Sequence, residues 1–521
     1  MRSPRHSLLC LSFVLAGWSV AQNNDVLLQR DIYRGLELKA AARGAYVHSG
    51  LKPVIERRAD LSATMGYAVD SAKYYFWYTE KLYRDHLLQV KQDDVRLSVD
   101  PLFRFELGSD RGDRTAYSDT NRYYANSRGF LLRGDLGPRF SFQTMFLETQ
   151  ALVPQYIFRR AQETGAVPGE ARVKVQDRRE LDYGWSQASI SYSPIDHLNV
   201  QFGHGRHFVG HGYRSMLLSD NALNAPYLKF SALFLKGRVQ YSTWHTRQLG
   251  GLSRQDRLPT GDAAESLFYW YRARYNHLSA QLGPLQLGLF EATLFRTIDS
   301  TRVLPFDAME LNPVIGLNTL LDAGAPGSGR LFGADVRVKI TDRLFAYGQY
   351  ALGEAVAWQA GVRAFDLGIK GFDLQLEYNT AEPYAYMNTP AELAYQHASQ
   401  PLAHPLGTYF QEAVLIAEQA VGRARLQVRS TRAMVHRDPL EGSAGADIGR
   451  PLPSVRDTLA AAPLELFTMD ANLSYLFNPK TNLRATLGVM RRDLPGAEDN
   501  FQSTYVYLAL RTDLFNRYYD L

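Results

Sequence analysis

The stretch FDLQLEYN, residues 372–379, alternates apolar and polar residues without a break. Successive side chains of a β-strand point to opposite faces, so this strand would have one apolar and one polar face. The stretches 334–340 and 482–489 repeat the pattern. A soluble β-sandwich also alternates, but its strands are shorter. Runs of about ten residues that are rich in aromatics and follow a secretion signal are typical of an outer-membrane β-barrel with a polar lumen.

We therefore predict an all-β fold, a transmembrane antiparallel β-barrel of about 18 strands, an even count being typical of single-chain bacterial barrels. The weakest strand is 409–418, because its residues 412–415 are equally compatible with a helix. The predicted strands are 95–107, 125–135, 138–150, 184–193, 197–205, 225–234, 236–247, 266–281, 284–297, 330–340, 343–352, 357–369, 371–380, 409–418, 421–435, 464–477, 481–492 and 500–511.

Short and long connections alternate along these strands. Turn residues such as those of 134–137 close every second pair, whereas the other pairs are joined by long segments. Barrels have short periplasmic turns and long outer loops. The parity therefore predicts that both termini are periplasmic and that function resides in the long loops. These loops are 151–183, 206–224, 248–265, 298–329, 381–408 and 436–463.

The first 21 residues have the features of a signal peptide. Arg2 and Arg5 form a basic start, residues 8–17 are apolar, and Ser19-Val20-Ala21 resembles a cleavage site. The single cysteine, Cys10, lies in the apolar stretch, so we expect no disulfide in the mature chain. Without these residues the chain has 56 basic and 53 acidic residues, a balance that does not indicate a nucleic-acid partner.

The segment between the signal peptide and the first strand is predicted to be helical. We expect helices at Asp25–Arg34 and Thr79–Lys91. Such a segment lies in the periplasm or in the lumen, and a plug is favoured because a barrel of about 18 strands encloses a wide lumen. The predicted organisation is a signal peptide at 1–21, a periplasmic helical plug segment at 22–93 and an outer-membrane barrel at 94–521.

The stretch from Phe202 to Asn221 resembles the signature loop of the Wzi-like capsule-assembly family, and the chain is most similar to its gliding-motility-associated (RemB-like) subgroup. The resemblance implies an outer-membrane barrel of about 18 strands, plugged by an N-terminal helical part, that holds capsular polysaccharide at the cell surface. Leu521 departs from the pattern, because such barrels usually end in Phe. Further matching stretches are 94–105, 310–314, 400–407 and 514–519.

Basic residues that share the polar parity of their strands are predicted to face the lumen. A basic lumen would bind an acidic polysaccharide through guanidinium–carboxylate pairs. Equally, these arginines could pair with acids of the plug, such as Glu56, Asp60 or Glu80. The predicted lumen set is Arg272, Arg274, Arg337, Lys339, Arg423, Arg425, Arg429 and Arg484. The candidate ligand-binding residues are Arg206, His211 and Arg214 of the signature loop with Arg272, Arg274, Arg337, Arg423 and Arg425.

Two further motifs carry little weight. His204, His207 and His211 have the spacing of metal ligands, but a Gly-rich loop with incidental histidines is favoured. Ser49-Gly50-Leu51-Lys52 matches the S-x-x-K of acyl enzymes, but Pro53 follows at once, which does not suit the helix that this motif requires. We expect no metal, no cofactor and no enzymatic activity.

The sequence thus predicts a non-enzymatic outer-membrane protein that binds or assembles surface polysaccharide, with a place in a gliding-motility apparatus suggested by the resemblance. The alternative is a channel or transporter for a small or oligomeric solute. Expected partners are the polysaccharide, outer-membrane lipid, the barrel-assembly machinery during insertion, and motility or secretion components. Attachment would be multivalent, with many weak contacts along a repeating polymer.

Overall fold

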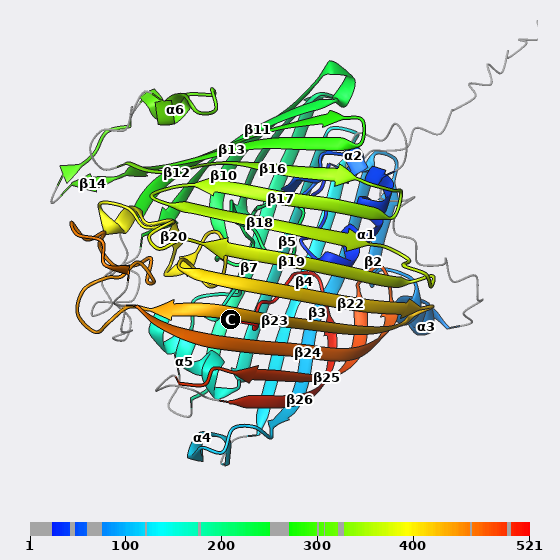
Figure 1. Ribbon diagram of the computed structural model, residues 1–521. Coiled ribbons are helices and arrows are strands. Elements are labelled where there is room, and N and C mark those ends of the chain that lie inside the picture. The colour runs from blue at the N-terminus through cyan, green and yellow to red at the C-terminus, as the bar shows by residue number, and fades with distance from the viewer. Residues whose placement is uncertain are drawn as a thin grey trace, which may run out of the picture.

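The computed structural model describes most of the chain that follows the predicted signal peptide. Within the described residues, 18 strands form a closed antiparallel barrel, and β26 (Ser503–Thr512) pairs with β3 (Val95–Asp110) to close it (Figure 1). The described residues are 23–41, 47–59, 76–119, 122–175, 179–250, 270–299, 302–306, 308–320, 328–458, 461–496 and 502–521.

Every predicted strand is confirmed, including the ambiguous one at 409–418, which is β22 (Phe410–Val421). It is a strand because its residues alternate between a buried luminal face and an exposed outward face. The other barrel strands are β4 (Tyr123–Leu136), β5 (Phe140–Leu152), β7 (Leu181–Ile195), β8 (Leu198–Gly205), β10 (Ala225–Phe234), β11 (Val239–Leu249), β12 (Trp270–Leu282), β13 (Leu285–Arg296), β16 (Ser328–Lys339), β17 (Leu344–Leu352), β18 (Val356–Ala364), β19 (Phe372–Ala381), β23 (Ala424–Arg437), β24 (Ala462–Asn478), β25 (Leu483–Asp493).

The predicted alternation of short and long connections is also present. One end of the barrel, here the short-turn end, carries tight hairpins such as the one that joins β4 to β5. The opposite end, here the long-loop end, carries α4 (Ala116–Asp119), α5 (Gln155–Thr164) and α6 (Leu317–Leu320). Figure 1 shows these helices beyond or beside one end of the strands.

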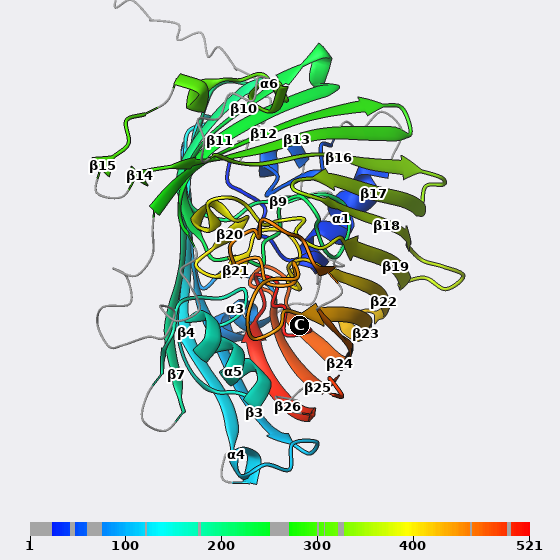
Figure 2. The same ribbon diagram turned by 60° about the vertical axis from the view of Figure 1, so that its left-hand side comes forward.

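The N-terminal segment enters the lumen from the short-turn end. The backbone amide of Asn23 donates to Ser141 and its side-chain amide donates to the carbonyl of Pro138, both next to the β4–β5 turn. Helix α1 (Arg30–Ala41) then lies inside the barrel (Figure 2). β1 (Leu51–Lys52) and α2 (Glu56–Ala59) follow.

In the part of the chain that the structure describes, no helix is long and apolar enough to cross a membrane.

Both predicted N-terminal helices differ in extent from the observed ones. The first begins at Arg30 rather than Asp25, because Asp25 forms a β-bridge with Ile55. The second, α3 (Trp77–Tyr83), ends well before Lys91. The prediction was wrong for β2 (Leu88–Gln92), a strand that pairs with β3, because Leu-Gln-Val-Lys-Gln alternates with period two.

Two further segments fill the lumen. The luminal loop, residues 206–223, crosses the barrel between β8 and β10, and its β9 (Phe208–Val209) pairs with β1. The C-terminal tail, residues 513–521, turns back into the lumen after β26. Leu521 there accepts a hydrogen bond from Arg492 Nε (2.9 Å) near the long-loop end of β25. The last strand thus ends at the short-turn end, and the tail then runs back inside the barrel, so that the C-terminal residue lies in the lumen.

The lumen has an apolar side and a charged side. On the apolar side, side chains of β11, β12, β13 and β16 pack against the luminal loop and the long loop 382–409 in one cluster. On the charged side, β3 and β23–β26 face the N-terminal segment and the C-terminal tail. The apolar cluster includes Leu217, Leu218, Trp244, Tyr271, Tyr275, Phe290, Leu294, Leu331, Tyr386 and Tyr395.

Candidate functional site: a charged cleft in the barrel lumen

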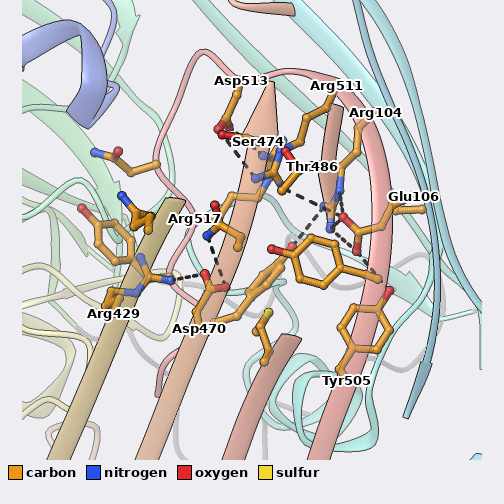
Figure 3. Close-up of a pocket in the computed structure, with 18 of the residues that line it drawn as sticks. Arg104, Glu106, Arg429, Asp470, Ser474, Thr486, Tyr505, Arg511, Asp513 and Arg517 are labelled. Carbon is orange, nitrogen blue, oxygen red and sulfur yellow. Dashed lines mark hydrogen bonds and ion pairs between the residues drawn. The ribbon is translucent and has the colours of Figure 1, made fainter. Parts of the chain in front are cut away.

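The charged side of the lumen contains a cleft (Figure 3). Residues of β25 line it from Arg484, near the short-turn end, to Met490, near the long-loop end. Its other walls come from β3, β23, β24 and β26, from the start of α1, and from the C-terminal tail. The cleft is thus elongated along the barrel wall rather than confined to one end.

Arginines outnumber carboxylates in the cleft. Seven guanidinium groups and four carboxylates line it, which gives an excess of positive charge. Six of the arginines and three of the acids come from barrel strands or α1, where strand alternation or helix position directs them into the lumen. The arginines are Arg30, Arg104, Arg425, Arg429, Arg484, Arg511 and Arg517, and the acids are Asp31, Glu106, Asp470 and Asp513.

Some of these charges are tightly paired. Arg104 donates two hydrogen bonds to Glu106, from Nε to Oε2 at 3.1 Å and from Nη2 to Oε1 at 3.0 Å. Arg429 NH2 donates to Asp470 Oδ2 at 3.1 Å. These bidentate and charge-assisted pairs are among the stronger polar contacts in proteins, so they fix the cleft walls.

Other guanidinium groups in the cleft have N–H donors that make only long contacts or none. The contacts of Arg511 are long: NH1 lies 4.0 Å from Glu106 Oε2, and NH2 lies 3.8 Å from Asp513 Oδ2. The buried Nε atoms of Arg425, Arg484 and Arg511 have no hydrogen-bond partner among the described residues. A buried donor without a partner is costly, so these atoms favour an added acceptor in the cleft.

The acids that lie outside the strands are held ionised. Burial alone would raise the pKa of Asp513, but the surrounding guanidinium groups, that of Arg511 above all, lower it overall. The pKa of Asp31 is likewise lowered, because Arg425 and Arg484 outweigh the effect of burial. Neither carboxyl is therefore suited to donate a proton near neutral pH.

Aromatic rings complete the wall. Tyr505 and Tyr507 stack with ring centroids 5.6 Å apart and planes 17° apart. The hydroxyl of Tyr505 donates to Glu106 at 3.1 Å, which fixes the first ring. Tyr213 of the luminal loop and Tyr519 of the tail also line the cleft. Rings of this kind present flat, partly apolar faces beside the charged groups.

Of the eight candidate ligand-binding residues, Arg425 lines this cleft, and so do Arg429 and Arg484 of the predicted lumen set. Arg425 pairs with Asp31 and Glu418, so the N-terminal segment does supply acids to a luminal arginine. Further pairs of this type join Arg133 to Glu56 and Arg363 to Glu37. The pairing alternative raised by the sequence therefore holds for much of the lumen.

The three candidates of the luminal loop are buried in the plug. Arg206 NH1 donates to the carbonyls of Gly169 (2.7 Å) and Asp220 (2.5 Å). Arg214 donates to Glu412 Oε1 and to the carbonyl of Asp520, each at 3.0 Å. His211 Nε2 lies 3.3 Å from Asp335, and burial lowers the pKa of His211 to about 4. These side chains hold the loop in place rather than line the cleft.

The remaining candidates are dispersed. Arg337 NH1 donates to Ser49 Oγ at 2.9 Å on the plug. Arg423 lies in the β22–β23 turn and donates to the carbonyl of Phe477 at 2.6 Å. Arg272 and Arg274 point outward, so their predicted luminal orientation is wrong. On β12 the luminal face is the apolar one, because it packs against the apolar cluster described above.

The three histidines of the possible metal motif lie apart from one another, and the S-x-x-K side chains are already hydrogen-bonded within the lumen. His204 faces outward, and His207 packs against Tyr227 and Trp244, away from His211. Within the described ranges no group of three or more His, Cys, Asp or Glu side chains could hold a metal ion. Ser49 accepts from Arg337, and Lys52 Nζ donates to the carbonyl of Gly210 at 2.6 Å, so both ends of the S-x-x-K motif are engaged in packing the plug.

Several cleft residues were not among the predicted site residues. Arg104, Arg511, Tyr505 and Tyr507 lie on the luminal parity of β3 and β26, so extending the alternation argument to the first and last strands would have found them. Arg517 lies in the tail, where alternation gives no signal.

No family model matches this sequence, and no curated protein matches it. Among solved structures, the chain is similar to Wzi of Escherichia coli, described as a carbohydrate-binding β-barrel of the outer membrane involved in group 1 capsule assembly. The TM-score is 0.57 at 12% identity, over 95% of this chain and 100% of that one. The chain is also similar to OpdQ of Pseudomonas aeruginosa (TM-score 0.44, 9% identity, 80% and 97% covered) and OprD of the same organism (TM-score 0.43, 7%, 80% and 94%). The likeness to Wzi shows that the fold is that of an outer-membrane β-barrel.

Proposed function

We propose that this protein is a non-enzymatic outer-membrane protein that binds an acidic surface polysaccharide in the luminal cleft and so retains it at the cell surface. The observation that carries the proposal is the cleft itself, in which arginines exceed carboxylates and stacked tyrosines lie beside them. The fold shared with Wzi, which is described as carbohydrate-binding, supports the same assignment.

The chemistry of the cleft suits a polyanionic sugar chain. A planar guanidinium binds a carboxylate through two parallel hydrogen bonds, and the unused Nε atoms of Arg484 and Arg511 provide such donors. Each contact alone is weak, but a repeating polymer can engage several sites at once, which raises the overall affinity without any single strong contact.

Binding without hydrolysis is supported by the state of the acids. Hydrolysis of a glycosidic bond commonly needs one carboxyl with a raised pKa as the proton donor. The pKa values of Asp31 and Asp513 are lowered by neighbouring arginines, and Glu106 is held by Arg104 in two hydrogen bonds. This arrangement favours fixed charges over proton transfer.

The proposed orientation places the short-turn end, with the N-terminal entry, in the periplasm and the long-loop end outside the cell. The polymer would then reach the cleft past Tyr124 and Pro154, which line it at the long-loop end. Insertion by the barrel-assembly machinery and a role within a gliding-motility apparatus remain predictions from the sequence.

The test compares Arg511→Gln with Arg432→Gln in a deletion strain. Arg511 has long contacts in the cleft, whereas Arg432 is an outward residue whose side chain is 73% exposed. We expect R511Q to shift polysaccharide from the cells to the medium at equal total synthesis and R432Q to retain it. Purified R511Q should bind polygalacturonate about tenfold more weakly than wild type, the loss of roughly one charged hydrogen bond. Unchanged retention and unchanged affinity in R511Q would refute the proposal.

A second candidate function, passage of a solute, is favoured by one observation: the cleft lining extends along β25 from Arg484 to Met490. Single-channel recording in planar bilayers separates the two. Steady wild-type conductance that polygalacturonate does not block would favour a channel, and a closed baseline with polymer binding would favour retention.

A further inference from the structure

A polar patch lies on the outer wall of the barrel, where lipid is expected. In β11, β12 and β13 the side chains of one parity belong to the apolar luminal cluster, so those of the other parity point outward. Two of the outward side chains are charged and nearly inaccessible to solvent: Arg274 is 2% exposed and Glu291 is 0% exposed. The outer-wall patch consists of Tyr241, His245, Arg272, Arg274, Asn276, Glu291 and Thr293.

The depth of this patch is within the membrane. A strand rises about 3.3 Å per residue and is tilted by about 40°, so each residue adds about 2.5 Å along the barrel axis. Arg274 is eight residues from Leu282, the short-turn end of β12, and therefore lies about 20 Å above that end. The apolar band of such barrels is about 25 Å tall. Leu287 and Leu289, the outward residues just below Glu291, are apolar and exposed.

A segment of the long connection between β13 and β16 covers the patch. We call residues 302–306 and 308–320 the outer cap; Figure 1 shows its α6 beside the barrel rather than over the lumen. Glu310 of the cap binds Arg272 with two hydrogen bonds of 2.8 Å each. The carbonyl of Glu310 also accepts from Arg274 NH1 (2.7 Å) and His245 Nε2 (2.8 Å).

Two more hydrogen bonds join the outer cap to β11 and β13. The hydroxyl of Tyr241 donates to the carbonyl of Pro313 at 2.6 Å. The hydroxyl of Thr319 donates to Glu291 Oε1 at 3.1 Å, and Asn276 Nδ2 donates to the other carboxylate oxygen at 3.3 Å. The polar groups of the cap thus face the wall and satisfy charges that would otherwise meet hydrocarbon.

The opposite face of the cap is apolar and uncovered in the described structure. Leu311 is 61% exposed and Leu320 is 83% exposed. Val303, Phe306 and Val314 are also exposed. Polar side chains toward the wall and apolar side chains away from it are the reverse of what a loop in water requires.

We propose that the outer cap is a lipid-facing element, whose apolar side chains lie among the acyl chains of the outer leaflet while its polar groups shield the outer-wall patch. Lipid is the occupant that the geometry favours, because the cap covers a section of the barrel wall and the outward residues next to it, such as Leu287 and Leu289, form the lipid-facing belt. A guanidinium group on the lipid-facing wall is destabilising, and the more so the deeper it lies. The cap shields Arg272 and Arg274 from such exposure.

The test uses spin labels on single cysteines, since the only cysteine of the chain lies in the predicted signal peptide. Leu311→Cys and Val314→Cys are compared in proteoliposomes with Leu287→Cys on the outward wall and Leu440→Cys in a loop, where the native residue is 98% exposed. We expect both cap labels to match the L287C label, with high collision rates with oxygen and several-fold lower collision rates with a water-soluble nickel chelate than the L440C label.

Each other outcome overturns the proposal. Nickel accessibility equal to that of the L440C label would place the cap in water, and low accessibility to both reagents would place protein, such as a second copy of the chain, on this face. Glu310→Gln in the L311C background should weaken the contact of the outer cap with Arg272 and increase the mobility of the spin label. Glu354→Gln, which removes an exposed carboxylate paired with Arg456 at 2.9 Å, is the matched control and should leave the label unchanged.

Discussion

Replacing Arg214 by alanine should loosen the luminal loop without unfolding the barrel. Arg214 is 1% exposed and joins three parts of the lumen. Its NH2 lies 3.0 Å from Glu412 Oε1 on β22 and 3.0 Å from the carbonyl of Asp520 in the tail. The guanidinium also lies over the ring of Tyr213, 4.7 Å from its centroid. Removing it deprives two buried carboxylates of their shared cation.

The free-energy cost of the substitution depends on which hydrogen-bond donors Glu412 and Asp520 keep. Loss of one partner of a buried ion pair costs about 3–5 kcal/mol. Glu412 keeps His404 Nε2 at 2.7 Å, and Asp520 keeps the hydroxyl of Tyr213 at 2.8 Å. Because each carboxylate retains a donor, we expect the lower value, about 3 kcal/mol. This corresponds to an increase of about 100-fold in the population of the opened loop.

Two assays report this opening. Hydrogen exchange of the amides in residues 206–223 should become about 100-fold faster in R214A, and brief open events in planar bilayers should become more frequent. The R432A variant, which removes an outward and largely exposed pair with Glu465, should behave as wild type. Combining Arg214→Ala with Glu412→Gln should recover part of the loss, since one unpaired charge is removed. Equal exchange rates in R214A and wild type would refute the reasoning.

Two other perturbations have definite expected outcomes. Burial lowers the pKa of His48, in the N-terminal segment, and of His397, in the loop 382–409, from 6.5 to about 4. Between pH 6.5 and pH 4 each histidine therefore binds more protons in the unfolded than in the folded chain. The free energy of unfolding of these luminal segments should fall as the pH drops through that window, by up to about 3 kcal/mol per histidine. Proteolysis of the plug at pH 7 and pH 4.5 checks this, and H48Q should reduce the difference. Gly129→Ala should lower the temperature at which the barrel unfolds on heated gels, because its Cβ would lie 1.8 Å from the carbonyl oxygen of Phe146. Gly184→Ala, where the Cβ would meet no atom within 4 Å, should have little effect, and equal shifts in the two variants would contradict the steric argument.

The fold could be predicted because alternation with period two is a local property of each strand. In β19 the apolar residues Leu376 and Tyr378 face outward and are exposed, while Glu377 and Asn379 face the lumen and are buried. The alternation of short and long connections then fixed the order of the hairpins. Neither signal depends on contacts between residues distant in the sequence, so both can be read from one chain.

The candidate site was less predictable because it depends on what fills the lumen. The charged cleft exists where the N-terminal segment and the C-terminal tail leave space beside β24–β26, and no local pattern shows where a tail will lie. Arg517 could not be found for that reason. Arg425 could be found, because it lies on a regular strand, but its pairing with Asp31 required the position of α1.

The wrong orientation of Arg272 and Arg274 has the same physical origin as the outer cap. A polar lumen was assumed all the way round, yet Tyr271, Ala273 and Tyr275 face an apolar plug there. Once the luminal face of β12 is apolar, the strand's polar residues must point outward, into the membrane. A charged outer wall is stable only if something covers it, and the cap does so. The luminal plug and the outer cap are therefore coupled features: a barrel that fills one side of its lumen with apolar side chains needs polar cover on the wall behind them.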